Sequence, residues 1–198
     1  MTESVIKLPY CVPDDMQAQV IISIVMGFAT DPTARWCWPD NDVYLQTMPN
    51  WVMATGGKAF GLGTAQYHNG CGALWLPPGV QSDEDQLDAI IQSTMTEQQQ
   101  NTVALLGEKL SPFEPDVPHW YLPLIGAESS ARGHGAGSTL ITSVTQECDR
   151  NGRLAYLVCS NPFNVGFYQR QGFEVMGEVH AGDFPVMTPM LRYPRQGA

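Results

Sequence analysis

Basic residues are scarce in this sequence: 10 lysines and arginines stand against 20 aspartates and glutamates, which gives a net charge of −10 over 198 residues. An acidic surface repels phosphate backbones, so no nucleic-acid partner is expected. The five cysteines are scattered and form no CxxC pair, which argues against a disulfide framework or a zinc site. The four histidines are dispersed as well, so we expect reduced thiols and no metal.

Long apolar runs are also missing. The longest, residues 20–26, is interrupted by Ser23 and is far too short to span a bilayer. The N-terminus has Glu3 and Lys7 before any apolar stretch, which is unlike a signal peptide. We therefore expect a cytoplasmic protein with no membrane partner.

The composition nevertheless supports a well-packed core. Hydrophobic residues make up 43% of the chain and aromatic residues 10%, which excludes bulk disorder. A chain of this length buries enough surface to fold without a disulfide or metal. We expect a single domain over residues 1–198.

The first half of the chain predicts strands and helices in alternation. Asn69-Gly70 is a strong hairpin signal between two of the strands, and Ser82 to Asp85 resembles a helix start. The expected strands are residues 5–8, 59–67 and 73–76, and the expected helices are 13–28, 41–54, one after Ser82 and one around 103–110. A loop with three prolines follows at residues 111–118.

The second half has a sharper pattern. Strands are expected over residues 119–127, 154–159, 173–179 and 187–193, and helices over 133–150 and 162–170. Strand–helix–strand order with short links predicts a parallel strand pair inside an α/β sheet.

A glycine-rich turn, residues 132–138 (Arg-Gly-His-Gly-Ala-Gly-Ser), connects a strand to a helix. Bare backbone N–H groups and a helix N-terminus together favour a bound phosphate, and Arg132 adds a positive charge. Two known phosphate loops do not fit: Gly137 stands where a Walker A loop needs lysine, and Ser138 where a dinucleotide fold needs its third glycine. A kinase or a nucleotide-binding oxidoreductase is thus disfavoured. The plainer alternative is a helix start whose glycines allow tight packing.

The residues of this turn resemble the pyrophosphate-binding signature of the GNAT N-acetyltransferase superfamily, because Arg132-x-x-Gly135-x-Gly137 matches Gln/Arg-x-x-Gly-x-Gly/Ala. Residues 124–127 and the segment from Ser160 to Phe173 are similar to other parts of that family, so the resemblance covers about residues 120–176. It implies a GNAT-like fold: a mixed, mostly antiparallel sheet with a parallel strand pair at the cofactor site and helices on both faces.

The resemblance also implies acetyl-CoA as cosubstrate and assigns residues to it. The implied cofactor-binding residues are Ile125, Gly126, Ala127, Arg132, Gly133, His134, Gly135, Ala136, Gly137, Ser138, Asn164 and Tyr168. A backbone N–H of Ile125 or Ala127 would polarise the thioester carbonyl. Two departures stand out: Glu128 is followed by Ser129 instead of proline, and residues 77–118 form an extra helical insertion that could build a lid or an acceptor wall.

Acetyl transfer to an amine needs a proton donor for the leaving thiolate and an acceptor for the amine proton. Tyr168 is the candidate acid, since a phenol near pKa 10 can donate to a thiolate whose thiol has a pKa near 8.5. The alternative for Tyr168 is a packing role beside Phe167 and Phe173. His119 is the candidate base, because alternation would place it on the same strand face as Ile125 and Ala127. Its alternative is a strand-end histidine without a catalytic role.

The sequence therefore predicts an N-acetyltransferase that acts on a primary amine of a small molecule by direct attack. Two alternatives remain: a CoA-binding sensor without turnover, and an acetyltransferase for protein lysines or N-termini. Trp36, Trp38, Trp51 and Trp75 either line an acceptor pocket or belong to the core. Strand edges in the last third are compatible with a homodimer.

Overall fold

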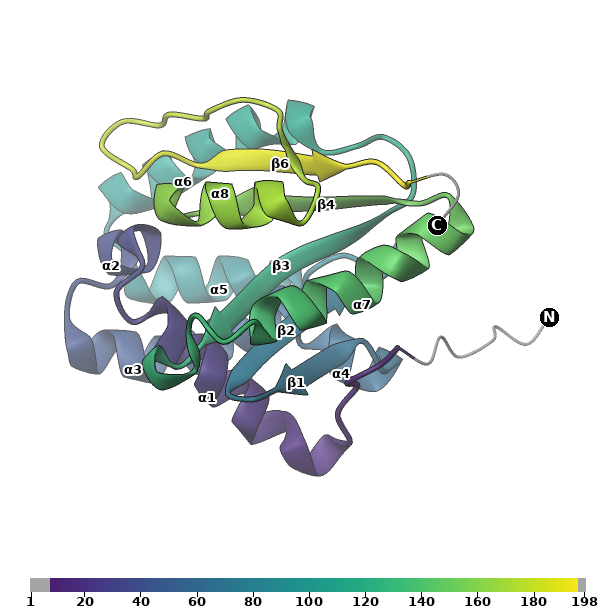
Figure 1. The fold of residues 1–198 in the computed structure, drawn as a ribbon. Helices are drawn as coiled ribbons and strands as arrows, with labels where there is room; N and C mark the ends of the chain where they lie inside the picture. The colour runs from purple at the N-terminus through teal and green to yellow at the C-terminus, as the bar shows by residue number, and fades with distance from the viewer. Residues whose placement is uncertain (1–7, 196–198) are drawn as a thin grey trace.

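The computed structural model describes residues 8–195, so the strand expected over residues 5–8 lies almost entirely outside the described residues. Six strands form one mixed sheet in the order β1-β2-β3-β4-β6-β5 (Figure 1). Neighbouring strands are antiparallel except β3 and β4, which are parallel. The predicted mixed α/β sheet with one parallel pair is confirmed. The strands are β1 (Ala65–His68), β2 (Cys71–Leu76), β3 (His119–Ala127), β4 (Leu154–Cys159), β5 (Glu174–Val175) and β6 (Thr188–Arg192).

Helices cover both faces of this sheet. On one face, α7 (Ala136–Asn151) and α8 (Pro162–Arg170) pack over β2, β3 and β4, with Leu140 and Ile141 fully buried. On the other face, α1 (Gln17–Phe28) and α3 (Asn41–Gly56) bury Ile24 and Met48 against β2 and β3. The short helix α2 (Pro32–Cys37) lies between α1 and α3 in the chain.

The segment at residues 77–118 folds into α5 (Glu84–Thr94), α6 (Glu97–Leu110) and a 3-10 turn (Ser111–Phe113). The side chain of Asp83 caps α5, and Thr96 and Gln99 form a capping box at the start of α6. In Figure 1 both helices lie behind the sheet, on the side away from α7 and α8. None of the helices in residues 8–195 has the length and apolar character that crossing a membrane requires.

A bulge interrupts β3 next to β2. Leu74 pairs with Leu124, but Leu76 pairs with Tyr121, so β3 uses three residues where β2 uses two. The extra residue shifts the alternation of side chains. Trp120, before the bulge, and Ala127, after it, both pack on the α7 side although their numbers differ in parity. The expectation that His119 shares a face with Ile125 and Ala127 is therefore wrong.

The parallel pairing of β3 with β4 ends at the same point. Tyr121 is the last residue of β3 that pairs with β4, opposite Tyr156. Pro123 follows two residues later and has no N–H to offer. Beyond Tyr121, β3 stays paired with β2 and β4 stays paired with β6, so the two parallel strands part and leave an opening in the sheet.

Two predicted strands differ from the structure. Residues 58–62 form the short helix α4 (Lys58–Leu62), closed by Gly63 in the left-handed region at φ 67°, before β1 begins at Ala65. The strand expected over residues 173–179 is reduced to β5 because the chain then leaves the sheet. In that loop Val179 and Phe184 pack instead against Leu106 of α6.

Candidate active site

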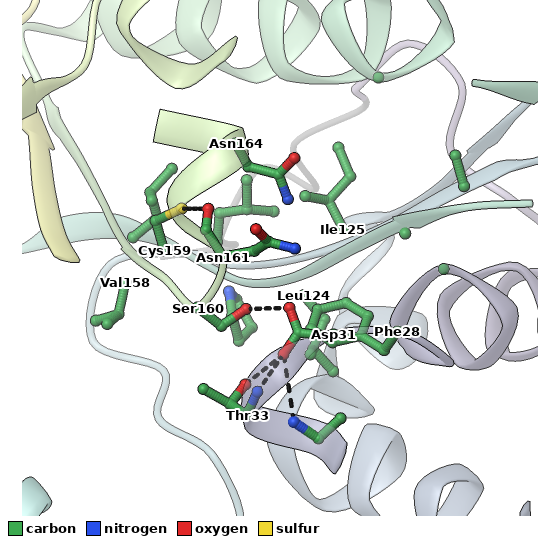
Figure 2. Close-up of a pocket in the computed structure, with 18 of the residues that line it drawn as sticks. Phe28, Asp31, Thr33, Leu124, Ile125, Val158, Cys159, Ser160, Asn161 and Asn164 are labelled. Carbon is green, nitrogen blue, oxygen red and sulfur yellow. Dashed lines mark hydrogen bonds between the residues drawn. The ribbon is translucent and has the colours of Figure 1, made fainter. Parts of the chain in front are cut away.

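A cavity of about 800 Å³ occupies the opening between β3 and β4. One side is formed by the glycine turn, the exposed edge of β3 and the start of α8. The other side is formed by α2, α3, Met95 and α6 of the insertion, and the loop around Phe184. Figure 2 shows this arrangement, with Asn164 and Ile125 on one side and Asp31 and Thr33 on the other.

The glycine turn has the backbone conformation that only glycine adopts readily. Gly133 and Gly135 have φ angles of 80° and 84°, and a Cβ built on either residue would meet no atom within 4 Å. Gly135 is the N-cap of α7, whose first N–H groups have no partner inside the helix. Gly137 is close to Phe167, 3.3 Å from a Cβ built there, so α7 can approach α8. The turn is thus an open, electropositive cradle that faces the cavity.

Arg132 also links two elements at the edge of the cavity. Its guanidinium donates to the carbonyl of Ala127 at 3.2 Å and to the carbonyl of Gly27 at 2.8 Å. The two bonds join the end of β3 to the end of α1. Arg132 therefore holds the first and second halves of the chain together beside the turn.

The free edge of β3 presents backbone groups to the cavity. The N–H of Glu128 donates to Gly70 on the β2 side at 3.1 Å. Because N–H groups alternate along a strand, those of Ile125 and Ala127 point away from β2, toward the opening. The carbonyl of Ala127 has the same orientation, since it accepts from Arg132. A ligand in the opening can pair with this edge.

Two residues of α8 also face the cavity. Asn164 and Tyr168, one helical turn apart, both line it. Tyr168 is only 9% exposed, and its ring lies edge-on to Phe167 and Phe173. Burial, and after it the neighbouring thiols and Asp31, raise the pKa of Tyr168 well above its usual range. The phenol therefore stays protonated and can act as a donor.

The sequence reasoning missed a buried carboxylate on the opposite side. Asp31 is 6% exposed and caps α2, with its Oδ1 accepting from the N–H groups of Thr33 (3.0 Å) and Ala34 (3.3 Å) and from the Thr33 hydroxyl. Its Oδ2 accepts from the hydroxyl of Ser160, at the end of β4, at 2.8 Å. Figure 2 shows the Asp31–Ser160 pair inside the cavity.

The sequence contains a local signal for the capping role of Asp31 but none for its contact with Ser160. Asp31 followed by Pro32 is the sequence pattern of an N-cap with proline at the first helical position. No local pattern points to the contact with Ser160, because the two residues are 129 positions apart.

Most of the predicted site residues meet in this cavity. Of those assigned to the cofactor, all but His134 line it. His119 also lies outside the lining: its ring packs edge-on against Tyr156, its Nδ1 is 2.9 Å from the carbonyl of Val117, and its Nε2 is 4.0 Å from Glu114. Of the four tryptophans considered, Trp38 and Trp51 line the cavity. Within residues 8–195 no group of three His, Cys, Asp or Glu side chains is arranged to hold a metal ion.

Comparisons with known proteins agree with this geometry. Residues 117–193, which contain β3, the glycine turn, β4 and α8, match the family model for the acetyltransferase (GNAT) domain.

Solved structures with the same fold include a histone acetyltransferase HPA2 and related acetyltransferase from Corynebacterium glutamicum, 21% identical with a TM-score of 0.66 over 94% of this chain and 96% of that one. A polyamine N-acetyltransferase from Drosophila melanogaster is 12% identical, with a TM-score of 0.61 over 92% and 97% of the two chains. Arylalkylamine N-acetyltransferase 2 from Aedes aegypti is 13% identical, with a TM-score of 0.60 over 93% and 97%.

Proposed function

We propose that the chain, whose residues 117–193 match the model of the acetyltransferase (GNAT) domain, is a GNAT acetyltransferase that transfers an acetyl group from acetyl-CoA to a primary amine of a small molecule. The observation that carries the proposal is one cavity with two different sides. The glycine turn and the β3 edge suit a phosphate-bearing, amide-rich ligand, and the Asp31–Ser160 pair opposite suits an amine.

The residues present fit acetyl-CoA. The cradle formed by Gly133, Gly135 and the first turn of α7 suits its pyrophosphate. The outward N–H groups of Ile125 and Ala127 suit the amides of the pantetheine arm, and one of them can polarise a carbonyl. Asn164 adds a side-chain amide at the same opening. When bound, acetyl-CoA supplies an activated acyl carbon with a thiolate leaving group.

Asp31 and Ser160 are placed to handle the amine. The amine nitrogen must lose a proton before or as it forms the new C–N bond, because alkylamines with pKa values near 10.4 are largely protonated at pH 7. Within residues 8–195, Oδ2 of Asp31 accepts a hydrogen bond from Ser160 alone, and it can accept the amine proton directly or through the serine hydroxyl. We assign this role to Asp31 in preference to His119, whose ring lies against Tyr156 outside the cavity lining.

Tyr168 remains the candidate donor to the sulfur. When the C–S bond breaks, the electron pair stays on sulfur, and the neutral phenol of Tyr168 can donate its proton there. An ammonium that becomes an amide loses two protons: one balances the proton that the thiolate gains, and the other leaves from Asp31 to solvent. The products are an N-acetyl amide and free CoA.

The buried position of Asp31 also bears on the kind of acceptor. A side chain that is 6% exposed inside a cavity can be reached by a small amine more readily than by a lysine on a folded protein. This favours a small-molecule acceptor over a protein substrate.

The cofactor half of the proposal is tested by calorimetric titration of acetyl-CoA. We expect saturable one-to-one binding that Gly135→Glu abolishes, because the new carboxylate repels phosphate at the cradle. Gly152→Glu is the matched control: Gly152, at the far end of α7, also has a positive φ, 61°, and lies outside the cavity lining. No binding to the wild type at millimolar acetyl-CoA, or equal loss in both variants, would reject the cradle as the cofactor site.

Turnover is tested separately by thiol release with a panel of primary amines. Amine-dependent release of free CoA supports catalysis. Tight acetyl-CoA binding without release by any amine supports the non-catalytic sensor instead.

A further inference from the structure

The acceptor side of the cavity continues beyond Asp31 into an apolar lobe. We define the acceptor lobe by the larger apolar side chains and the thiol that line the cavity from the α2 region, α3, the insertion and the Phe184 loop: Cys37, Trp38, Met48, Trp51, Met95, Val103, Leu106, Leu110, Phe184 and Met187. None of these ten side chains is charged. Thr33, Ala34 and Thr55, from α2 and α3, line the cavity beside them. Three side chains of the lobe, Val103, Leu106 and Leu110, recur along one face of α6 at helical spacing.

The polar groups at this lobe are uncharged. The Thr55 hydroxyl beside it is buried and has no hydrogen-bond partner within residues 8–195. The indole N–H of Trp38 donates to the hydroxyl of Thr94 at 3.0 Å, and its ring meets that of Trp51 edge-on. Burial, with Asp31 adding to it, raises the pKa of Cys37 to about 12, so that thiol is neutral at pH 7. The lobe offers no free charge to a ligand.

The charged side chains that line the cavity lie outside the acceptor lobe. Within the described part of the chain, Asp31 is the one carboxylate that lines the cavity. The cations that line it, Arg132 and Arg170, belong to the glycine turn and α8, on the cofactor side. Asp31 is near both sides, because it caps α2, whose last residue Cys37 lines the lobe, and accepts from Ser160 next to the end of β4 at 2.8 Å.

From this arrangement we propose that the acceptor is a monoamine with an apolar or aromatic body, in contrast to a diamine or polyamine. The inference rests on the proposed acetyl transfer. Asp31 receives the single ammonium at the reacting end, and the acceptor lobe receives the hydrocarbon. A second ammonium in the lobe would lose its hydration without a counter-charge, which is costly.

On this proposal, the insertion determines which amines the cavity accepts. Leu106 is 6% exposed, and both it and Val103 come from α6, which is part of the segment between the hairpin and β3. A change of polarity at this wall alters which amines fit and leaves the cofactor side untouched.

The test compares hexylamine with 1,6-diaminohexane, which differ only by a second amine on the same chain. Acetyl-CoA binding is first confirmed by calorimetry, and kcat/KM is then measured by thiol release. We expect hexylamine to exceed the diamine by at least about 10-fold. In the series from ethylamine to hexylamine, kcat/KM should rise by up to about four-fold per methylene that the lobe buries.

Val103→Asp adds a carboxylate to the wall and should reverse the preference toward 1,6-diaminohexane. The matched control is Leu105→Asp, on the same helix but 40% exposed and outside the cavity lining, which should keep the wild-type preference. Acetyl-CoA affinity should be unchanged in both variants.

The outcomes separate the two proposals. Equal or better use of the diamine by the wild type, or a flat response to chain length, overturns the monoamine inference and leaves acetyl transfer standing. Failure of the wild type to bind acetyl-CoA overturns both. If Val103→Asp does not fold, the wild-type amine series alone still decides the inference.

Discussion

Replacing Asp31 with asparagine separates the two roles of its carboxylate. Oδ1 caps α2 through the N–H groups of Thr33 and Ala34, and the amide oxygen of asparagine can accept both bonds. Asparagine is as good an N-cap as aspartate, so the free energy of unfolding should change by no more than about 0.5 kcal/mol. The negative charge that faces Ser160 is lost, however, and with it the group proposed to take the amine proton.

The expected kinetic effect is large. Loss of a general base costs about 10²- to 10⁴-fold, so Asp31→Asn should lower kcat/KM for a small amine by at least about 100-fold, or about 2.7 kcal/mol of transition-state stabilisation. Asp31→Ala should show the same loss of activity and also a loss of stability of about 2–4 kcal/mol. It removes the cap and leaves the hydroxyls of the buried Thr33 and the half-buried Ser160 without their acceptor.

Thiol-release kinetics and urea unfolding of the three proteins measure the two effects independently. The reasoning is refuted if Asp31→Asn keeps wild-type kcat/KM, because the charge then has no part in the reaction. It is equally refuted as a separation of roles if Asp31→Asn loses as much stability as Asp31→Ala. Calorimetry with acetyl-CoA serves as the control and should give unchanged affinity in both variants.

Two further variants test Tyr168 of α8 and Asp149 of α7. Tyr168→Phe keeps the ring packed against Phe173 but removes the phenol proton. We expect kcat to fall by about 10²-fold and acetyl-CoA affinity to stay nearly unchanged. An unaltered kcat would show that Tyr168 has no part in the reaction. The Arg192 guanidinium, through its hydrogen bonds at 2.8 Å, holds the pKa of Asp149 below its usual range. The stability from this pair is therefore full above about pH 4 and is lost as the pH falls through the lowered pKa. Asp149→Asn should cost about 2 kcal/mol at pH 7 in urea unfolding, and a difference from wild type that does not shrink at low pH would contradict this.

The elements on the cofactor side could be predicted closely from sequence. The predicted bounds of β3, β4 and α8 agree with the structure, because each element is delimited by local signals. Asn161 caps α8, Pro162 stands at its first position, and Gly172, at φ 90°, follows its end. Such signals act within a few residues of the boundary that they set, so one sequence is sufficient to find them.

Errors arose where a short apolar run had no such signals of its own. Ala59-Phe60-Gly61-Leu62 fits a strand as well as a helix by periodicity. The structure makes it helical because α4 continues directly from α3 and ends at Gly63, with Ala59 fully buried. Tertiary packing decides such segments, and a local pattern does not contain it.

The acceptor side could not be predicted because its parts are assembled across the whole chain. Asp31 meets Ser160 only because β4 separates from β3, and that separation starts beside a bulge that alternation along β3 does not reveal. One extra residue in β3 thus has two effects: it turns His119 away from the face of Ile125 and Ala127, and it lies where the sheet opens to admit α2 and α6 to the cavity lining. The same bulge therefore removes the support for His119 as the base. It also makes room in the cavity for Asp31, to which we assign that role. In this chain the group proposed to accept the amine proton therefore comes from the start of α2, outside the parallel strand pair.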